Sequence, residues 1–433
     1  MRKIHWEFPV TASSVREVLP RAQVSIDSVS GSVQHIIDEV RYRGLEAITR
    51  HAREFDQVVP KDFRVSPAQL AKAADELEPD LRSSIELAIE RVRRVSQAQL
   101  PDVVATELAP GGVVTTRYVP VDSVGLYVPG GKAVYPSSAI MNVVPAQVAQ
   151  VPRIVICSPA QLEYDGLPHP SILATAHLLG VDEVYAIGGA SAVAAFAYGI
   201  PEIGFAPTRL VTGPGNIYVA AAKRLLRSVI GIDSEAGPTE ILIIADKTAN
   251  PRFVAADLIS QAEHDENAAS VLVTDSQELL DEVIAELERQ VAGTANKERV
   301  QAALAGVQSA AVLVPSIEVA VAIANEYATE HLEIHTSDAQ AVANQISNAG
   351  AIFVGDYSPV SLGDYIAGSN HVLPTGEQAK FSAGLNVLSF LRSQQVISYD
   401  KTALSESMQR LVTFSHAEGL PAHGDAAAIR FEN

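Results

Sequence analysis

The chain has 433 residues, and its hydrophobic content of 47 % is enough to bury a sizeable core in roughly two to four domains. The 51 acidic residues outnumber the 32 basic ones and leave a net charge of −19, which disfavours binding to nucleic acid or anionic lipid. A single cysteine excludes an intrachain disulfide and a cysteine-rich zinc site. We find no apolar targeting segment and no run of about 18 apolar residues, and therefore expect a cytoplasmic protein without a membrane span.

Helical patterns follow an N-terminal arm over residues 1–26 and continue to about residue 100. Between residues 32 and 55, apolar side chains recur at three- and four-residue spacing, as on one face of a helix. From residue 121 the chain changes to short apolar runs such as VGLYV, RIVIC and EILIIAD, which alternate with helical stretches. Such an alternation is typical of a parallel sheet covered on both faces.

A second series of the same kind starts with a predicted helix over 251–263 and continues through the strands SVLVT, AAVLVP, HLEIHT and AIFVGD. Beyond about residue 387, VLSFLRSQQ and the residues after it become helical again. We therefore predict an α/β fold with two doubly wound, incomplete Rossmann-like domains, a small N-terminal arm and a small helical C-terminal domain.

Three glycine-containing turns, YVPGGKAVYPSS, GGASAV and GPGNIYV, follow predicted strands. At the carboxyl ends of parallel strands, such turns let the backbone approach a phosphate near the start of the next helix. The dinucleotide fingerprint is incomplete because GPGNIY lacks its third glycine, so turns that need glycine only for their shape are the alternative. Tyr127 and Asn216 are candidate cofactor contacts, or else a packed aromatic ring and a helix cap.

The segment QAEH holds the first candidate metal ligands, Gln261 and His264. Asn250 is a plausible N-cap with Pro251 at the first helical position, so the helix should reach Gln261 or beyond. Leu258 and Gln261 then share an inward face, and His264 lies one turn further. A buried glutamine and histidine need partners, and either a divalent cation or a hydrogen-bonded helix end would supply them.

Three further polar groups lie in the last third of the chain. Glu330 and His331 adjoin a helix–strand junction, where they are either two proton acceptors or an exposed polar dipeptide. Asp364 and His371 lie in a Gly/Ser-rich loop, where ligating groups concentrate, and Asp364 is either a ligand or a turn cap. Glu418 and His423 flank a Gly-Leu-Pro break, and residues so placed near a terminus are usually exposed to solvent. Cys157 ends an apolar strand, where inert burial is the alternative to a thiol nucleophile.

Seven motifs follow one another along the chain: VGLYVPGG, GPGN, AGPTE, DLISQAEHD, EHLEI, AGSNHVLPTG and GLPAH. In order and spacing, they closely resemble those of the histidinol dehydrogenase family. The resemblance spans nearly the whole chain. It implies zinc ligands at Gln261, His264, Asp364 and His423, a set without cysteine, and proton acceptors at Glu330 and His331.

The resemblance also implies the residues that contact substrate and cofactor. The NAD contacts fall on Tyr127, Ser191 and Asn216. The substrate contacts fall on Thr239, Gln261, His264, His331, Asp364, Glu418 and His423. Three positions depart from the family pattern: Ser191 stands where glutamine is common, Thr239 replaces a frequent serine but keeps the hydroxyl, and Thr329 stands where proline is usual.

The activity implied by the resemblance is oxidation of L-histidinol to L-histidine through L-histidinaldehyde, with two NAD molecules reduced in turn and one Zn²⁺ per subunit. His331 would take the alcohol proton, and Glu330 would activate water for addition to the aldehyde. The family is a homodimer in which the C-terminal segment, with Glu418 and His423, reaches the partner's site. A zinc hydrolase of a small cationic substrate is the rival enzyme, and an α/β receptor for such a ligand is the rival binding protein.

The expected division has four parts. Residues 1–26 form the arm, and residues 27–118 with 241–386 form a discontinuous α/β domain that carries the catalytic residues and most zinc ligands. Residues 119–240 form an inserted α/β domain with the NAD-binding turns. Residues 387–433 form a tail domain that contributes to the partner's site.

Overall fold

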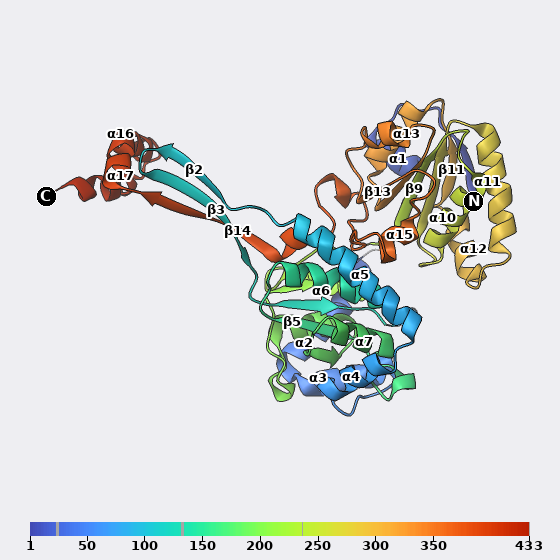
Figure 1. The fold of residues 1–433 in the computed structure, drawn as a ribbon, viewed down its shortest axis with the longest axis horizontal. Coiled ribbons are helices and arrows are strands. Elements are labelled where there is room, and N and C mark those ends of the chain that lie inside the picture. The colour runs from blue at the N-terminus through green and yellow to red at the C-terminus, as the bar shows by residue number, and fades with distance from the viewer. Residues whose placement is uncertain (23–25, 131–133, 236, 433) are drawn as a thin grey trace.

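The computed structural model describes residues 1–22, 26–130, 134–235 and 237–432. Figure 1 shows two α/β lobes next to each other and a third unit that projects away from them and carries the C-terminus. Within the described residues, no helix is both long and apolar enough to span a membrane.

One lobe contains a five-stranded parallel sheet in the order β6-β5-β4-β7-β8, and we call it the five-stranded lobe. Its strands are β4 (Val124–Tyr127), β5 (Ile154–Ser158), β6 (Val184–Ala186), β7 (Leu210–Thr212) and β8 (Gly231–Ile232). One face is covered by α4 (Pro67–Asp75), α5 (Pro79–Ala98), α6 (Pro136–Val148) and α7 (Pro170–Leu178). The other is covered by α2 (Asp27–Arg43), α3 (Leu45–His51), α8 (Gly189–Tyr198) and α9 (Ile217–Leu226).

The second lobe, the six-stranded lobe, has a parallel sheet in the order β1-β11-β10-β9-β12-β13. Its strands are β1 (Arg2–His5), β9 (Glu240–Ala245), β10 (Ala269–Thr274), β11 (Ala310–Leu313), β12 (His331–His335) and β13 (Ala351–Val354). One face carries α10 (Pro251–Ala262), α11 (Gln277–Val291), α12 (Lys297–Ala305) and α15 (Val360–Tyr365). The other carries α1 (Ala12–Val18), α13 (Ile317–Tyr327) and α14 (Ala339–Ala343).

Both sheets share one topology, in which the first strand of the lobe is central and the chain then winds outward on each side. Setting aside the added edge strand β1, the third, second, first, fourth and fifth strands follow one another across each sheet. This is the doubly wound order of a Rossmann-like domain without its sixth strand. The predicted α/β fold with two incomplete Rossmann-like domains is confirmed.

The predicted division of the chain needs correction at three places. Residues 104–118 join neither α/β lobe, because they pair in the antiparallel sheet of the projecting unit. The helices between residues 27 and 98 share the apolar core of the five-stranded lobe and not that of residues 241–386. The arm is not separate either, because β1 pairs with β11 and α1 packs on the six-stranded sheet. An amphipathic pattern predicts that a helix will bury one face, but it does not specify which of two apolar sheets will cover it.

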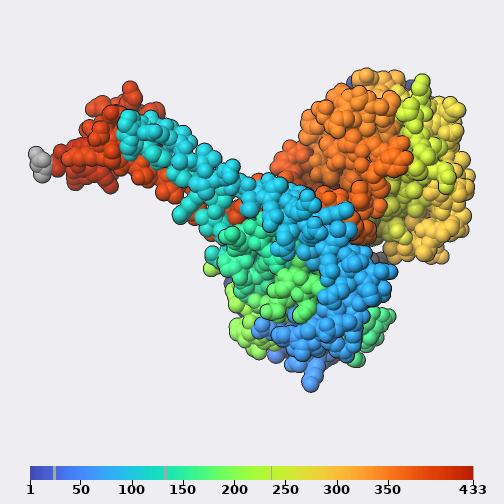
Figure 2. All heavy atoms as spheres, in the orientation of Figure 1, coloured from blue at the N-terminus to red at the C-terminus, as the bar shows by residue number. Residues whose placement is uncertain are grey.

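The unit that projects from the two lobes in Figure 2 is built around an antiparallel sheet in the order β14-β3-β2, whose strands are labelled in Figure 1. Its elements are β2 (Val104–Ala109), β3 (Gly112–Pro120), β14 (Leu391–Tyr399), α16 (Lys401–Ala417) and α17 (Pro421–Ala428). The helical prediction after residue 387 is therefore wrong for 391–399, although it holds for α16. So short a segment has no decisive periodicity, and pairing with β3 satisfies its backbone in the extended form.

Short helices complete the chain. A π-helical turn, η1 (Ala52–Asp56), continues α3. The 3₁₀ turns are η2 (Leu162–Tyr164), η3 (Pro201–Ile203), η4 (Gln378–Lys380), η5 (Val387–Phe390) and η6 (Ile429–Phe431).

Candidate active site

A pocket of about 910 Å³ is lined by both lobes. From the five-stranded lobe, it takes residues at the carboxyl ends of β4, β6 and β7, where doubly wound sheets bind ligands. From the six-stranded lobe, it takes residues at the amino ends of β9 and β12 and on the loop around α15. Turns suited to a nucleotide and groups suited to acid–base chemistry therefore share one cavity.

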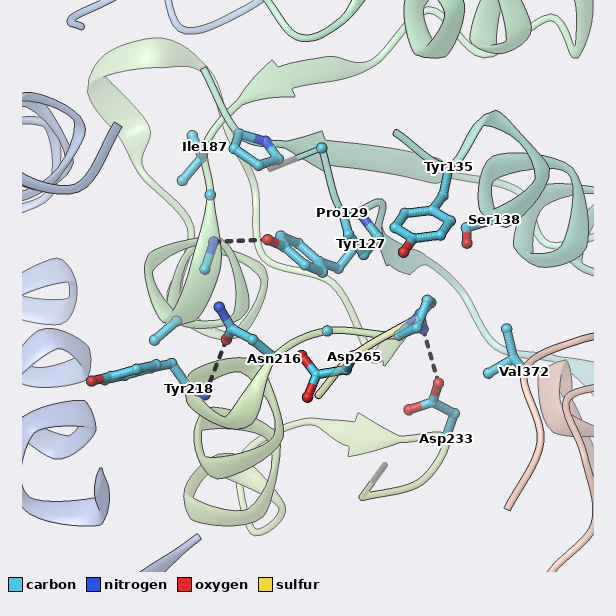
Figure 3. A pocket seen from close by; sticks show the side chains of 18 of the residues that line it. Tyr127, Pro129, Tyr135, Ser138, Ile187, Asn216, Tyr218, Asp233, Asp265 and Val372 are labelled. Carbon is cyan, nitrogen blue, oxygen red and sulfur yellow. Dashed lines mark hydrogen bonds between the residues drawn. The ribbon is translucent and has the colours of Figure 1, made fainter. Parts of the chain in front are cut away.

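Tyr127 ends β4 and lies in the pocket wall (Figure 3). Its hydroxyl accepts a hydrogen bond of 3.1 Å from the backbone N–H of Gly189, at the start of α8. Burial raises the pKa of Tyr127 to about 12, so the hydroxyl is neutral at physiological pH. The ring is packed, as one sequence interpretation expected, and it also lines the cavity, so its contact with a cofactor stays a prediction. Residues 131–133 of the glycine-containing motif predicted after this strand lie outside the described residues.

The GPGN turn is held by a buried ion pair. Lys223 donates to the carbonyl of Gly213 at 2.5 Å and to Asp233 Oδ1 at 2.6 Å, and Asp233 Oδ2 accepts from the Gly213 N–H at 2.9 Å (Figure 3). Gly213 has a φ of 113°, and a Cβ there would collide with the carbonyl oxygen of Tyr127. Asn216 follows as the N-cap of α9 and also lines the pocket.

Ser191 lines the pocket but is only 4 % exposed. Its hydroxyl lies 2.9 Å from His51 Nδ1, and His51 Nε2 lies 3.0 Å from Glu39 Oε2. The side chain that replaces the usual glutamine is thus engaged with the protein itself. Sequence reasoning favoured a structural role for His51, and its contact with Ser191, 140 residues further along the chain, could not be predicted from local sequence.

A chain of hydrogen bonds links three predicted site residues. Thr239 Oγ1 donates to Glu330 Oε2 at 2.5 Å and accepts from Gln261 Nε2 at 2.5 Å. Glu330 Oε2 also accepts from the backbone N–H of Glu240 at 3.1 Å. The predicted helix and its inward face are confirmed, because α10 starts at an Asn250 cap and ends at Ala262 with Gln261 buried.

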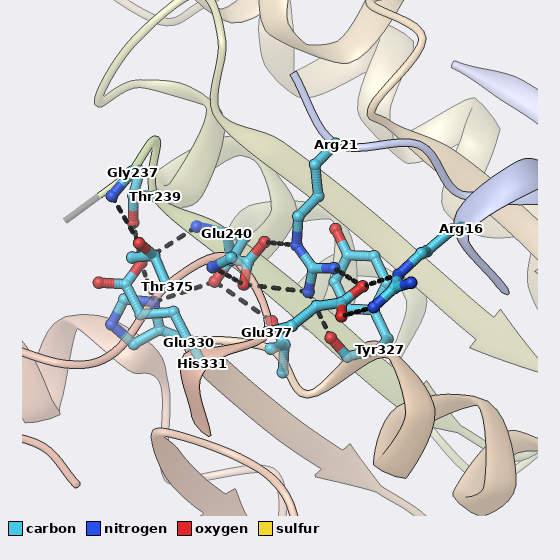
Figure 4. A network of polar contacts seen from close by, with 12 residues as sticks. Arg16, Arg21, Gly237, Thr239, Glu240, Tyr327, Glu330, His331, Thr375 and Glu377 are labelled. Carbon is cyan, nitrogen blue, oxygen red and sulfur yellow. Dashed lines mark hydrogen bonds and ion pairs between the residues drawn. The ribbon is translucent and has the colours of Figure 1, made fainter. Parts of the chain in front are cut away.

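Glu330 has an unusual protonation equilibrium. Burial raises its pKa to about 7, while His331 and the hydrogen bond from Thr239 act in the opposite direction. Beneath it, the buried Glu240 pairs with Arg21 at 2.6 Å, and the Arg21 guanidinium lies 3.9 Å from the centre of the Tyr327 ring (Figure 4). Glu330, with a pKa near neutrality, can therefore both hold and release a proton at working pH.

The His331 ring is oriented by a backbone carbonyl of the neighbouring strand, β9. Its Nδ1 lies 3.2 Å from the carbonyl oxygen of Glu240, which can only accept, so Nδ1 carries a proton when this bond is made. Its Nε2 is buried and has no hydrogen-bond partner among the described residues. The same nitrogen lies 4.0 Å from Asp364 Oδ1. The free lone pair therefore faces the Asp364 side of the pocket.

His264 and Asp364 lie in the same wall. Desolvation lowers the pKa of His264, although the Asp364 carboxylate opposes that shift, and the neutral imidazole is the form that binds metal. Gln261 Oε1 is buried without a hydrogen-bond partner in the described structure. An orphaned amide oxygen, a neutral imidazole and a carboxylate are a fitting donor set for Zn²⁺.

Glu418 and His423 do not join this set within one chain. They are exposed at the end of α16 and in α17, on the projecting unit, and neither lines the pocket.

Cys157 is buried in β5, and burial raises its thiol pKa, which fits the inert interpretation.

His371 was singled out with Asp364 from the sequence, but its place in the pocket wall and its contacts were not predicted. His371 Nδ1 lies 3.0 Å from the carbonyl oxygen of Asp364, and its Nε2 lies 3.1 Å from Ser138 Oγ. It thereby links the α15 loop to α6 of the other lobe. The signal was its position on the same Gly/Ser-rich loop as Asp364, but a loop does not reveal which way a ring points.

Comparisons with known proteins identify the family of this chain. A family model described as histidinol dehydrogenase matches residues 19–431. The chain is 55 % identical over 422 residues to a histidinol dehydrogenase of Leifsonia xyli, covering 98 % of this chain and 97 % of that one. It is 57 % identical over 415 residues to that of Thermobifida fusca, covering 96 % and 94 %. A crystal structure of histidinol dehydrogenase from Elizabethkingia anophelis superposes with a TM-score of 0.94 at 30 % identity, covering 99 % and 98 %.

Proposed function

The chain belongs to the histidinol dehydrogenase family, oxidoreductases of histidine biosynthesis, and we propose that it oxidises L-histidinol to L-histidine in two successive hydride transfers. The observation that carries the proposal is the pairing of two different proton acceptors in one pocket. His331 presents an unpartnered Nε2, and Glu330 beside it has a pKa of about 7.

In the first oxidation, His331 Nε2 accepts the proton of the substrate alcohol as the hydride leaves carbon. Its Nδ1–H remains bonded to the Glu240 carbonyl, which keeps the ring in the orientation and tautomer that the reaction needs. In the second oxidation, Glu330 takes a proton from the water that adds to L-histidinaldehyde. Thr239 and the Glu240 N–H hold that carboxylate in place.

We assign the zinc ligands of the site to Gln261, His264 and Asp364, with His423 from a second subunit. The unpartnered Oε1 of Gln261 and the lowered pKa of His264 support this assignment. Zinc, when bound, supplies the positive charge that orients the amine and imidazole nitrogens of the substrate.

The cofactor occupies the five-stranded part of the pocket, against Tyr127, Asn216 and the turn at Ser191. NAD, when bound, accepts the hydride in each oxidation. The hydroxyl of Ser191 is held by His51, and both residues line the pocket. We propose that the cofactor packs against this pair, in place of a contact with the longer glutamine side chain that is common at position 191 in the family.

The active unit is a homodimer in which Glu418 and His423 complete the partner's site. Both lie on a unit that projects from the lobes and exposes large apolar side chains, as an uncovered interface does. These side chains include Val104, Leu108, Val396, Ile397, Leu411, Phe414, Leu420 and Ile429. Glu418 then suits the ammonium group of the substrate.

Absorbance of NADH during turnover tests the activity. With L-histidinol, we expect two NADH molecules for each substrate molecule consumed. Metal analysis of the purified protein should give one Zn²⁺ per chain. His331→Ala and Glu330→Gln are the matched controls, of which the second should stop at the aldehyde step. An active zinc hydrolase would show product without NADH, and that result would refute the dehydrogenase.

A mixture of two inactive variants tests the shared site. If His423→Ala and His331→Ala chains are unfolded together and refolded, about half of the dimers are mixed, and each mixed dimer has one intact site. We expect recovery of about a quarter of wild-type activity for random pairing. If the mixture is as inactive as its parents while mixed dimers form, His423 serves its own chain and the assignment fails.

A further inference from the structure

A second group of ionisable side chains lies outside the pocket, on the face of the six-stranded sheet that carries α10 and α15. Asp257, Glu333 and His335 bring three potential ligand atoms within 4.8 Å of one another, and we call them the acid–histidine cluster. Glu333 and His335 are buried, and the Asp257 side chain is 13 % exposed. None of the three lines the pocket, and the mechanism above does not use them.

The contacts of the cluster use both nitrogens of one imidazole. His335 Nε2 lies 3.3 Å from Glu333 Oε2 and 3.8 Å from Asp257 Oδ2, and His335 Nδ1 lies 3.3 Å from Asp356 Oδ1. Burial by itself would lower the pKa of His335, but hydrogen bonding and charge from these carboxylates outweigh it and raise the pKa. A doubly protonated ring therefore satisfies the carboxylates around it.

Glu333 also makes a contact that leaves the cluster. Its Oε1 accepts a hydrogen bond of 2.7 Å from the backbone N–H of Val360, the first residue of α15. The N-cap of this helix is Pro359, which has no side-chain oxygen to offer. Glu333 thus supplies the acceptor that the helix start lacks, from a different element and from a position with no exposed surface.

The elements joined in this way carry the active-site residues. Asp257 lies one turn before Gln261 on α10, and Glu333 follows His331 by two residues on β12, so that both side chains lie on the same face of the sheet. The six-stranded sheet is rigid and buried here, with β12 paired to β9 and β13 on its two sides.

Val360 lies one turn before Asp364 on α15. We propose that Glu333 is a positioning residue of the active site: it ties the start of α15 to β12 and α10, and thereby sets the place of Asp364 relative to His331 and Gln261. This role rests on the proposed function, since it explains how a ligand on a six-residue helix is held opposite a base on the sheet.

The experiment compares Glu333→Ala with Glu333→Gln, which keeps an oxygen for the Val360 N–H, and with Val360→Pro. Proline at this first helical position removes the N–H and also replaces the buried Val360 side chain, while Pro359 before it already has the extended backbone that a following proline requires. Asp338→Ala is the matched control, because Asp338 likewise accepts a first-turn N–H, that of Ala341 in α14, but on the other side of the sheet.

Three quantities are measured on the full-length protein: zinc affinity by chelator competition, the kinetic constants with L-histidinol, and amide hydrogen exchange of 360–366 in the metal-free protein. For Glu333→Ala and Val360→Pro, we expect zinc affinity to fall by about 10- to 100-fold, kcat to fall with it, and exchange over 360–366 to rise. Glu333→Gln should recover most of the zinc affinity. Asp338→Ala should lower the melting temperature without changing zinc affinity.

Unchanged exchange over 360–366 in Glu333→Ala and Val360→Pro would overturn the tether, whatever the activity of the enzyme. Faster exchange with unaltered zinc affinity and kcat would overturn the positioning role and leave a structural one. A wild type that neither binds zinc nor oxidises histidinol would refute the proposed function, and with it the positioning role. Two zinc ions per wild-type chain, one of them lost in Glu333→Ala, would make the cluster a cation site and also overturn the proposal.

Discussion

Replacing Thr239 by valine should remove the hydrogen bonds that connect Glu330 with Gln261 and leave the shape of the candidate active site unchanged. Valine keeps the volume and branching of the side chain but removes the hydroxyl that donates to Glu330 and accepts from Gln261, each at 2.5 Å. A hydrogen bond to a charged group contributes about 1.5–3 kcal/mol. We therefore expect kcat/KM for L-histidinol to fall by about 10- to 150-fold.

The pH dependence gives the sign of the effect. The hydrogen bond from Thr239 lowers the pKa of Glu330, which burial otherwise raises, so its loss moves that pKa upward from about 7. Since only the ionised carboxylate accepts a proton, activity rises with pH through this pKa. The acidic limb of the kcat/KM profile should thus shift to higher pH in Thr239→Val, and the defect should be larger at acidic than at alkaline pH.

Steady-state kinetics across pH, with zinc content measured in parallel, checks this reasoning. Thr239→Ser keeps the hydroxyl and should stay within about twofold of the wild type. Thr175→Val is the control for loss of a buried hydroxyl elsewhere, since Thr175 donates only to the backbone carbonyl of Ser171 in α7. A Thr239→Val enzyme with wild-type kcat/KM and an unmoved acidic limb would refute the link between Thr239 and Glu330.

Three further changes have defined outcomes. Glu330→Gln should reduce the overall oxidation by about 10²- to 10⁴-fold. It should also stabilise the metal-free protein at high pH. The pKa of Glu330 is raised from 4.5 to about 7 by folding, so the wild type loses stability as pH rises through 7 and the buried carboxyl ionises, whereas the variant does not. The stability advantage of the variant, on the order of 3 kcal/mol by denaturant unfolding, should appear above pH 7 and fade towards pH 4.5. Lys223→Met breaks the buried pair with Asp233, which should cost about 3–5 kcal/mol of unfolding free energy and raise the KM for NAD, measured by titration at saturating histidinol. Asn216→Ala removes the N-cap of α9 and should cost about 1 kcal/mol by thermal unfolding.

Each of these results has a counterpart that would contradict it. Equal stabilities of Glu330→Gln and wild type at high pH would mean that the buried carboxyl ionises without penalty. An unchanged KM for NAD in Lys223→Met, with the protein still folded, would mean that the GPGN turn keeps its shape without the ion pair. An Asn216→Ala protein as stable as the wild type would contradict the capping role of Asn216.

The sequence predicted the parts of the fold that depend on local patterns. Apolar strands alternating with amphipathic helices led to two doubly wound sheets, and the Asn250–Pro251 pair located the start of α10. Local patterns did not predict which lobe the helices before residue 100 would cover, because both sheets present apolar faces. They also failed for β14, whose partner β3 lies some 270 residues earlier in the chain.

The site followed the same division. Residue types and motif order were enough to select Gln261, His264, Glu330, His331 and Asp364, since a metal or a proton transfer needs those donor and acceptor groups. Spacing alone left Gln261 and His264 open between a metal site and a helix end. Only the structure revealed the buried Oε1 of Gln261 without a partner.

By itself, the sequence determined the chemistry that this chain can perform, because the identity of each donor and acceptor is a property of the residue. The tertiary structure alone decided the state of those groups. The pKa of Glu330 depends on burial by elements that lie up to 90 residues away, and the free Nε2 of His331 depends on a carbonyl of the neighbouring strand. Protonation and orientation are set by the surroundings of a group, and here those surroundings exist only once β9 and β12 of the six-stranded lobe have paired.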